Sequence, residues 1–357
     1  MAASICFVVG ARPNFMKAAP VHRALRALAP DAEVLLVHTG QHYDAEMSKV
    51  FLDELGLPEP DVFLGVGSGS HAEQTAKALV GIEEVLVERR PDLVVVPGDV
   101  NSTLAGALAA AKLHIPVAHL EAGLRSYDRR MPEEHNRVVA DHLSRVLLVH
   151  SESAIDNLRR EGLTEGVHFV GNTMIDSVLA HVERARAAGP WAEHGLEPGG
   201  YGLVTLHRPA MVDDEARLAA VVEALGRLAA EQPLLFPVHP RTQTRLGERL
   251  PAGLIATGPL GYLAFLGLQA EAHFVVTDSG GVQEETSALG VPCFTLRDTT
   301  ERPVTVELGT NTVLGTDPAA LGRVPGLLAQ ARPAGPIPLW DGAAGPRAAE
   351  ALLRELG

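Results

Sequence analysis

Several carboxylates stand directly after apolar segments, at positions that suit acid and base chemistry. Asp99 follows "LVVVPG", and Glu121 follows "VAHL". Glu133 and Glu134 come shortly afterwards, in "MPEEHNR". If the apolar segments are parallel strands, their carboxyl ends meet at one edge of a sheet. Carboxylates gathered there have their pKa values pushed apart, which suits an acid and a base acting on one substrate.

Glu133 and Glu134 also have a structural interpretation. They follow Pro132, so they can be the acidic first turn of a helix. Glu133 is four residues before Arg137, which is the spacing of a helical ion pair. This interpretation fits Asp99 and Glu121 less well, because both stand beside otherwise apolar strands.

Two turns have the composition of an anion site. In "GARPNFMK" (residues 10–17), Arg12 lies in the turn and Lys17 about one helical turn further on. In "FVVTDSGGVQEE" (residues 274–285), two glycines stand where a helix should begin. Free N–H groups and the positive end of a helix bind phosphate at such turns. The structural alternative for Arg12 and Lys17 is an ordinary surface turn.

Histidines follow two further apolar segments. His207 in "VTLHRP" and His239 in "FPVHPRT" are each predicted to end a strand, where an imidazole can bind phosphate or move a proton. The alternative is a histidine that only caps backbone groups. His119, His135 and His142 are scattered, and the chain has no H-E-x-x-H or C-x-x-C motif. We therefore expect no metal site.

The elements that must position these residues alternate regularly. Short Val/Leu/Ile-rich segments alternate with helical patterns, which predicts parallel sheets covered on both faces. The pattern restarts around a Gly/Pro-rich stretch at residues 187–202. We expect two α/β domains with a ligand cleft between them, comprising residues 1–170 and 171–344. A final helix, residues 345–357, is expected to pack back on the first domain.

Composition and charge exclude several classes of protein. The net charge is −14 over 357 residues, without a long basic run, so we expect no nucleic-acid partner. No apolar stretch approaches the roughly 18 residues of a membrane span, and no signal-peptide pattern is present, so a cytoplasmic location is expected.

Cys6 and Cys293 lie in apolar runs and are predicted to be buried thiols. No dinucleotide fingerprint or Walker A motif occurs, so no cofactor is expected.

Nine motifs together resemble the non-hydrolysing UDP-N-acetylglucosamine 2-epimerases of bacteria and archaea. In order along nearly the whole chain they are "GARPNFMKAAP", "TGQHYD", "PGDVNSTLA", "HLEAGLRS", "MPEEHNR", "GNTMIDSV", "TLHRP", "TDSGGVQEE" and "RDTTERP". The resemblance implies two Rossmann-like domains in the glycosyltransferase-B arrangement, a UDP-sugar substrate and a homodimer.

The resemblance also implies roles for individual residues. The residues matched to catalysis are Asp99, Glu121, Glu133 and His207. Those matched to binding of UDP and its sugar are Arg12, Lys17, Arg137, Asn172, His239, Phe265, Ser279, Gly280, Gly281, Glu285 and Arg302. Gln41, His42 and Gln74 match the place of a second, activating UDP-N-acetylglucosamine in bacterial members. Glu284 and Glu285 point about 100° apart on a helix, so Glu285 can hold the ribose while Glu284 is structural.

The implied reaction is the reversible C2 epimerisation of UDP-N-acetylglucosamine to UDP-N-acetylmannosamine. No carbonyl adjoins C2, so we expect elimination of UDP to a glycal, followed by re-addition. This route needs donors that hold the charge of the departing UDP, and an acid/base group on each face of the sugar. The alternatives are a hydrolysing or modified-sugar 2-epimerase, a glycosyltransferase of the same architecture that requires an acceptor, and a non-enzymatic nucleotide-sugar sensor.

Overall fold

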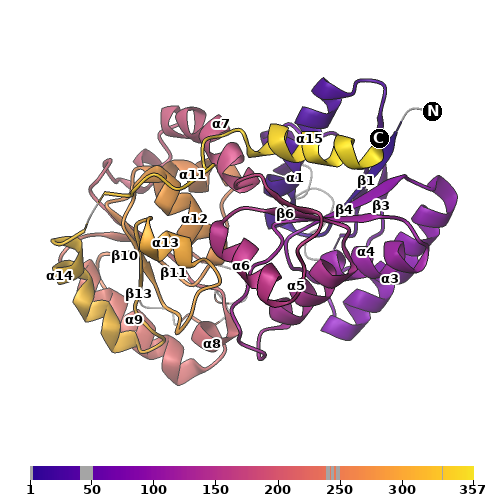
Figure 1. The fold of residues 1–357 in the computed structure, drawn as a ribbon. Coiled ribbons are helices and arrows are strands. Elements are labelled where there is room, and N and C mark those ends of the chain that lie inside the picture. The colour runs from indigo at the N-terminus through magenta and orange to yellow at the C-terminus, as the bar shows by residue number, and fades with distance from the viewer. Residues whose placement is uncertain (1–2, 41–50, 239–241, 243–244, 247–249, 332) are drawn as a thin grey trace. The chain divides into compact units, whose positions relative to one another are not determined.

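Figure 1 shows the fold as a computed structural model, which describes residues 3–40, 51–238, 242, 245–246, 250–331 and 333–357. The chain divides into two units. Unit 1 is Met1–Ser177 with Pro338–Gly357, and unit 2 is Val178–Ile337. The sequence places the domain boundaries after residue 170 and before residue 345; these positions stay a prediction.

Unit 1 is built on a seven-stranded parallel sheet with the strand order β3-β2-β1-β4-β5-β6-β7. Its strands are β1 (Ser4–Val9), β2 (Glu33–His38), β3 (Val62–Phe63), β4 (Leu93–Pro97), β5 (Val117–Leu120), β6 (Val146–Val149) and β7 (Val167–Phe169). Its helices are α1 (Arg12–Leu28), α3 (His71–Arg89), α4 (Asn101–Lys112), α5 (Pro132–Leu143), α6 (Glu152–Arg160), the first part of α7 (Thr173–Ala187), and α15 (Ala344–Leu356).

Unit 2 has a six-stranded parallel sheet in the order β10-β9-β8-β11-β12-β13. Its strands are β8 (Gly202–Thr205), β9 (Leu234–Pro237), β10 (Leu254–Thr257), β11 (Phe274–Thr277), β12 (Cys293–Thr295) and β13 (Asn311–Val313). Its helices are η1 (Ala192–His194), α8 (Pro209–Val212), α9 (Glu215–Ala229), α11 (Tyr262–Ala270), α12 (Gly280–Leu289), α13 (Pro303–Glu307), η2 (Pro318–Arg323) and α14 (Val324–Leu328).

The apolar strands are buried on both faces, as their continuous hydrophobic runs predict. All five residues of β4 are buried. In β8, Leu203 and Val204 belong to different core clusters, and so do Val275 and Val276 of β11. Successive side chains of a strand point to opposite faces, so each cluster fills one side of the sheet. Burying one such side chain contributes about 1.5–3 kcal/mol.

Each sheet has one point where the strand order reverses. In unit 1 the chain leaves β1 for β2 on one side and later returns to β4 on the other. In unit 2 the corresponding neighbours are β8 and β11. Turns that follow neighbouring parallel strands at such a switch point lie side by side and form the usual ligand site of this fold class.

The C-terminal helix packs within unit 1, where Figure 1 shows α15 in yellow beside α1. The contact is close because α15 has glycine at position 345. A Cβ atom on Gly345 would lie 2.7 Å from the backbone of Pro20, in the middle of α1. The helix start is held by Asp176, whose carboxylate accepts the N–H groups of Ala344 and Gly345 at 3.1 and 2.7 Å. Two segments that are far apart in the sequence are thus joined.

Both cysteine thiols are free and buried, as predicted. Burial raises the pKa of Cys6 to about 12 and that of Cys293 to about 11. Neither thiol therefore has the low pKa of a reactive nucleophile. Among the helices of the described residues, none combines the length and apolar character needed to cross a membrane.

Candidate active site

The turn after β1 is fixed by the side chain of Asn14. Its Oδ1 accepts the N–H groups of Gly10 and Ala11 at 3.0 and 3.3 Å, and its Nδ2 donates to the carbonyl of Pro97 at 2.8 Å. Asn14 therefore ties the turn after β1 to the end of β4. Gly10 is required at this place because a Cβ atom would overlap the side chain of Ser102.

Lys17 and Glu121 form a buried ion pair in unit 1. Each side chain is only 6% exposed, and the ammonium of Lys17 donates to Oε2 of Glu121. Glu121 has a φ of +75°, in the left-handed region. A residue other than glycine costs about 1–3 kcal/mol there and persists only where its surroundings impose it. Strained residues of this kind cluster at active sites and ligand clamps.

Asp99 comes two residues after β4 and pairs with α5. Arg137 Nη2 donates to Asp99 Oδ2 at 2.5 Å, and Nη1 of the same guanidinium donates to Glu134 Oε2 at 2.9 Å. The side chain of Arg137 is 2% exposed, so both pairs are well shielded on the arginine side. The amide of Asn136 also donates to the carbonyl of Asp99, at 2.9 Å. The first turns of α5 therefore hold Asp99 in place.

The two glutamates at the start of α5 have different environments. Glu134 accepts the backbone N–H groups of Ser126 and Tyr127, each at 2.9 Å, so it orders the preceding loop. The alternative interpretation, in which Glu133 pairs with Arg137, is wrong: Arg137 pairs with Glu134, three residues away. Among the described residues Glu133 makes no hydrogen bond or ion pair.

Asn172 and Gln74 are the other predicted site residues of unit 1 with described side chains. Asn172 Oδ1 accepts the N–H of Met174 at 3.0 Å, while its buried Nδ2 has no partner among the described residues. Gln74 Nε2 donates to the carbonyl of Gly67 at 3.3 Å, and its Oε1 accepts from Asn101 at 3.0 Å. Asn172 thus keeps a donor for a ligand.

Three predicted site residues of the chain have no described position, and a fourth has only its backbone described. Gln41, His42 and His239 lie outside the described residues. The backbone of Arg12 begins α1. The roles assigned to these four residues stay predictions.

In unit 2, His207 is held by Asp278. The Nδ1 atom of His207 lies 3.0 Å from Oδ1 of Asp278, whose carboxylate also accepts the backbone N–H groups of His207 and Arg208. Burial raises the pKa of Asp278, but the charge of His207 and these hydrogen bonds together lower it below the usual value. The imidazole is oriented through Nδ1 and is 44% exposed, so Nε2 is the atom offered to a ligand.

Helix α12 begins at Gly280, two residues after Asp278, and its first N–H groups are not capped by a side chain. Ser279 occupies the N-cap position but makes no side-chain cap hydrogen bond. A Cβ atom on Gly280 would overlap the guanidinium of Arg302 and lie 2.7 Å from Glu301 Oε1. Glycine therefore lets a buried arginine lie directly against the helix start. Free N–H groups, the helix dipole and a guanidinium together fit a diphosphate.

The two glutamates of α12 face different neighbours. Glu284 Oε2 lies 3.0 Å from Nε of Arg302, so Glu284 supports the arginine. Gln269 of α11 donates to Glu285 Oε2 at 2.9 Å when its amide is oriented to satisfy its hydrogen bonds. Phe265, on the same helix, is buried in the cluster that includes Val282. The division of roles between Glu284 and Glu285 stays a prediction, and the geometry is compatible with it.

Comparison with known proteins identifies the family. The family model for UDP-N-acetylglucosamine 2-epimerase matches residues 24–353. A UDP-N-acetylglucosamine 2-epimerase of Methanocaldococcus jannaschii is 45% identical over 87% of this chain and 88% of its own length. The chain belongs to the UDP-N-acetylglucosamine 2-epimerase family.

Other members of the family extend the comparison. A UDP-2,3-diacetamido-2,3-dideoxy-D-glucuronate 2-epimerase of Pseudomonas aeruginosa is 44% identical over 87% of this chain and 88% of its own length. The crystal structure of the M. jannaschii UDP-GlcNAc 2-epimerase in complex with UDP-GlcNAc and UDP superposes with a TM-score of 0.91 at 41% identity, covering 98% of this chain and 99% of that one. The fold is therefore α/β with two Rossmann-like units of the glycosyltransferase-B type, as predicted.

Two residues that order the candidate site were not predicted. Asn14 lies inside the motif "GARPNFMK", and Asp278 directly follows β11. The rule that selected Asp99 and Glu121, a carboxylate just past an apolar strand, also selects Asp278. Asn14 has no comparable signal, because only the fold shows that its amide joins two turns.

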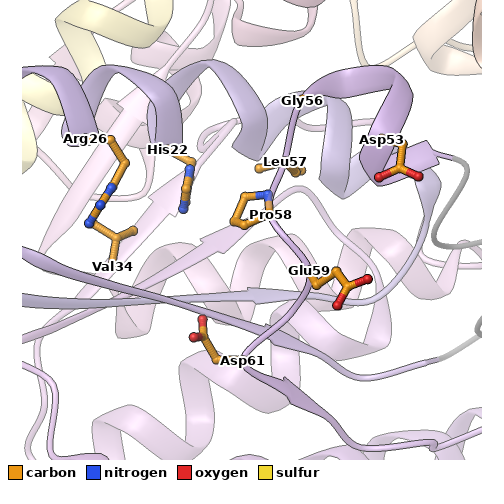
Figure 2. A pocket seen from close by; sticks show the side chains of 9 residues that line it. All are labelled: His22, Arg26, Val34, Asp53, Gly56, Leu57, Pro58, Glu59 and Asp61. Atoms are coloured by element: carbon orange, nitrogen blue, oxygen red, sulfur yellow. The ribbon is translucent and has the colours of Figure 1, made fainter.

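A separate hollow in unit 1 does not have the chemistry of a UDP-sugar site. It measures about 570 Å³, and Figure 2 shows His22 and Arg26 of α1 and the carboxylates of Asp53, Glu59 and Asp61 around it. Three carboxylates repel a diphosphate, and no predicted site residue lines the hollow. Asp61 is moreover engaged in structure, because its Oδ2 accepts the N–H of Leu36 at 2.8 Å. The hollow is therefore not part of the predicted nucleotide-sugar site.

Proposed function

We propose that the chain interconverts UDP-N-acetylglucosamine and UDP-N-acetylmannosamine by inverting C2 of the sugar. The observation that carries this proposal is the near-complete match to the M. jannaschii UDP-GlcNAc 2-epimerase, whose structure contains UDP-GlcNAc and UDP. The chain is thus an enzyme of the isomerase class.

We propose that residues of unit 2 bind the UDP part of the substrate. We assign the diphosphate to the N-terminal N–H groups of α12, beside Arg302, with His239 as a further ligand. Glu285 accepts the ribose hydroxyls in this assignment, and Phe265 lies near the uracil. His207, oriented by Asp278, donates a proton or hydrogen bond to the oxygen that UDP carries away. From unit 1, Arg12, Lys17, Arg137 and Asn172 complete the predicted binding set.

The reaction proceeds by elimination and re-addition in this proposal. A carboxylate takes the C2 proton, the electrons of the C2–H bond form a C1–C2 double bond, and the C1–O bond breaks with its electron pair leaving on UDP. A second group then delivers a proton to C2 from the opposite face as UDP re-adds at C1. This sequence is redox-neutral and uses no redox cofactor.

The carboxylates of unit 1 supply the two acid/base groups. Asp99 and Glu121 are each paired with a buried cation, Arg137 and Lys17, so protonation of either one weakens an ion pair. Glu133 has no such partner among the described residues and changes its protonation state without that loss. We therefore propose Glu133 as one of the two groups, with Asp99 or Glu121 acting on the other face.

Chromatography of the nucleotide sugars tests the proposal. The purified protein is incubated with UDP-N-acetylglucosamine alone, and separately with UDP-N-acetylmannosamine alone. Both reactions should reach the same ratio of the two. Accumulation of UDP with free N-acetylmannosamine would show a hydrolysing enzyme, and turnover only after addition of an acceptor would show a glycosyltransferase.

A second candidate substrate has a specific observation in its favour. The P. aeruginosa relative, at 44% identity, is named for UDP-2,3-diacetamido-2,3-dideoxy-D-glucuronate, and it is as similar as the M. jannaschii enzyme. The chemistry at C1 and C2 is the same, and only the substituents at C3 and C5 differ. A kcat/KM ratio measured for both sugars decides between them, and the proposal requires the N-acetylglucosamine form to be preferred.

We also propose that the protein is a cytoplasmic homodimer activated by a second UDP-N-acetylglucosamine near Gln41, His42 and Gln74. The family resemblance supports this proposal.

The dependence of the rate on substrate concentration tests the activation. We expect a sigmoidal curve for the wild type and a hyperbolic curve for Gln74→Ala. A hyperbolic wild-type curve would contradict the activation, and a monomeric mass by light scattering would contradict the dimer.

A further inference from the structure

A buried histidine in unit 1 has acceptors on both ring nitrogens. His119 lies in β5 and is 0% exposed. Its Nδ1 is 2.6 Å from Oδ1 of Asp141, and its Nε2 is 2.7 Å from the carbonyl oxygen of Gly98. Asp141 is on α5, and Gly98 forms the turn directly after β4. The ring therefore bridges a helix and a strand end.

The nature of these acceptors determines the protonation of the ring. A carbonyl oxygen only accepts, so Nε2 must carry a hydrogen. Asp141 also receives Arg125 Nη1 at 2.7 Å and the backbone N–H of Gly123 at 3.1 Å. A carboxylate oxygen that accepts from a guanidinium is favoured in its ionised form. Nδ1 then has to donate as well, which makes His119 an imidazolium.

The surrounding charges support this state. Arg125 Nε and Nη2 also donate to Glu161, at 2.7 and 2.6 Å. The group therefore holds two cations, His119 and Arg125, and two anions, Asp141 and Glu161. His142 approaches the outer side of Glu161, at 3.3 Å. Burial raises the pKa of Asp141. The charges of His119 and Arg125 and the hydrogen bonds from both side chains lower this pKa, and the net result is a pKa below the usual value.

The same pair holds the two turns that carry predicted catalytic carboxylates. Gly98, whose carbonyl accepts from His119, immediately precedes Asp99. Gly123, whose N–H donates to Asp141, comes two residues after Glu121. Both glycines have positive φ angles, +69° and +80°, so both turns are tight and sensitive to displacement. Through one ring and one carboxylate, the turns after β4 and β5 are tied together.

We propose that His119, protonated on both ring nitrogens and paired with Asp141, is a positioning residue that fixes Asp99 and Glu121 relative to each other. The catalytic part of this inference depends on the proposed epimerase function. His119 touches no substrate in this account. It acts through the backbone of the two turns. Because both ring nitrogens carry a hydrogen, the ring donates to Asp141 and to the carbonyl of Gly98 at the same time.

NMR of the imidazole nitrogens tests the protonation directly. The protein is labelled with ¹⁵N-histidine, and the His119 signals are assigned by their loss in His119→Gln. Both ring nitrogens should appear protonated at pH 8, because each one faces a hydrogen-bond acceptor. Observation of a neutral ring with one unprotonated nitrogen at pH 8 would overturn the proposal.

Asp141→Asn is a second and milder variant. The Asn oxygen still accepts from Arg125, and its NH₂ group faces Nδ1, so His119 becomes neutral while its Nε2–H bond to Gly98 remains. The variant should show one unprotonated ring nitrogen. Its kcat should lie between those of the wild type and His119→Gln. Thermal unfolding shows whether His119→Gln folds. If it does not fold, Asp141→Asn still tests the proposal.

Kinetics and amide shifts test the positioning role. In His119→Gln, kcat should fall on the order of 10–100-fold with a much smaller change in KM, because misplacement of reacting groups acts on the chemical step. The control is His114→Asn, an exposed residue with a φ of +60° that asparagine tolerates. The backbone amide shifts of residues 98–99 and 121–123 should move in His119→Gln and stay unchanged in the control.

These readouts separate this inference from the proposed function. The ring protonation and the amide shifts require no turnover, so they answer the structural question even if UDP-N-acetylglucosamine is not the substrate. Unchanged amide shifts, or an unchanged kcat in His119→Gln, would refute the positioning role. An inactive wild type with the predicted NMR signals would refute only the proposed function.

Discussion

At the scale of single residues, the candidate site contains several ion pairs in which at least one partner is buried. Lys17 pairs with Glu121, Arg137 with Asp99 and Glu134, and His207 with Asp278. Burying a charge is costly, and removing one partner of a pair leaves the other unmatched. Substitutions at these places therefore affect folding and catalysis together, and controls must distinguish the two.

The first prediction concerns the ion pair of Lys17. Lys17→Met removes the cation that pairs with the buried Glu121 carboxylate, and we expect the free energy of unfolding to fall by about 3–5 kcal/mol. Urea denaturation measures the change. The matched control, Lys112→Met, removes an exposed lysine of α4 and should cost less than about 1 kcal/mol. Equal losses in the two variants would contradict the buried pair.

The second prediction concerns Asp278 and pH. The pKa of Asp278 is lowered in the folded protein, so its contribution is fully present above the unfolded pKa of about 3.9 and is lost as pH falls through the lower folded value. Asp278→Asn should lose about 1.5–3 kcal/mol of stability at pH 7. Its difference from the wild type should shrink below pH 4.

Urea unfolding at pH 7 and pH 3.5 measures that difference. Glu223→Gln is the control, because Glu223 forms an exposed helical pair with Arg227 and should change stability by less than about 1 kcal/mol. A stability difference for Asp278→Asn that grows as the pH falls would refute the account of this carboxylate.

Single residues also show which features of the candidate site could be predicted from the sequence. The places of Asp99 and Glu121 just past β4 and β5 were predictable, because each one follows an apolar strand-like segment, while their catalytic roles stay predictions. The partner of Arg137 was not, because helical spacing allows a pair at either three or four residues and the loop at Ser126 decides between them. The left-handed φ of Glu121 was also unpredictable, since nothing local marks a residue other than glycine for that conformation.

At the scale of elements, the site depends on how strands end and helices begin. The alternation of apolar strands and helices predicted both parallel sheets, because that pattern depends only on burial. The resemblance matched Gly280 and Arg302 to one binding set, but their direct contact was not predictable, because no local pattern shows which segment packs against the start of α12. The glycines of "TDSGG" indicated a tight turn, but only the fold shows that Gly280 makes room for a guanidinium.

The third prediction concerns this helix start. Gly280→Ala places a methyl group against Arg302 and Glu301, so the helix or the arginine must shift. We expect UDP to bind at least 10-fold more weakly, which corresponds to about 1.4 kcal/mol, as measured by isothermal titration calorimetry. Gly326→Ala, also in unit 2, has nothing within 4 Å of the added atom and should leave UDP affinity unchanged. Wild-type affinity in Gly280→Ala would contradict the assignment.

At the scale of the whole molecule, the two units offer different chemical groups. Unit 2 offers cationic and N–H groups suited to a nucleotide diphosphate, and unit 1 offers the carboxylates suited to proton transfer. Both sets stand at the carboxyl ends of strands, at or near the switch points of their sheets. The chain belongs to the UDP-N-acetylglucosamine 2-epimerase family, and we propose that both sets serve one reaction on a UDP-sugar.

Heavy water tests that connection most directly. The protein is incubated in ²H₂O with UDP-N-acetylglucosamine, and C2 is followed by NMR. Because the C2 proton leaves on a side chain that exchanges with solvent, UDP-N-acetylmannosamine should form with deuterium at C2, and the recovered substrate should acquire it as well. Formation of the epimer with its original C2 proton retained would contradict the proposed elimination and re-addition.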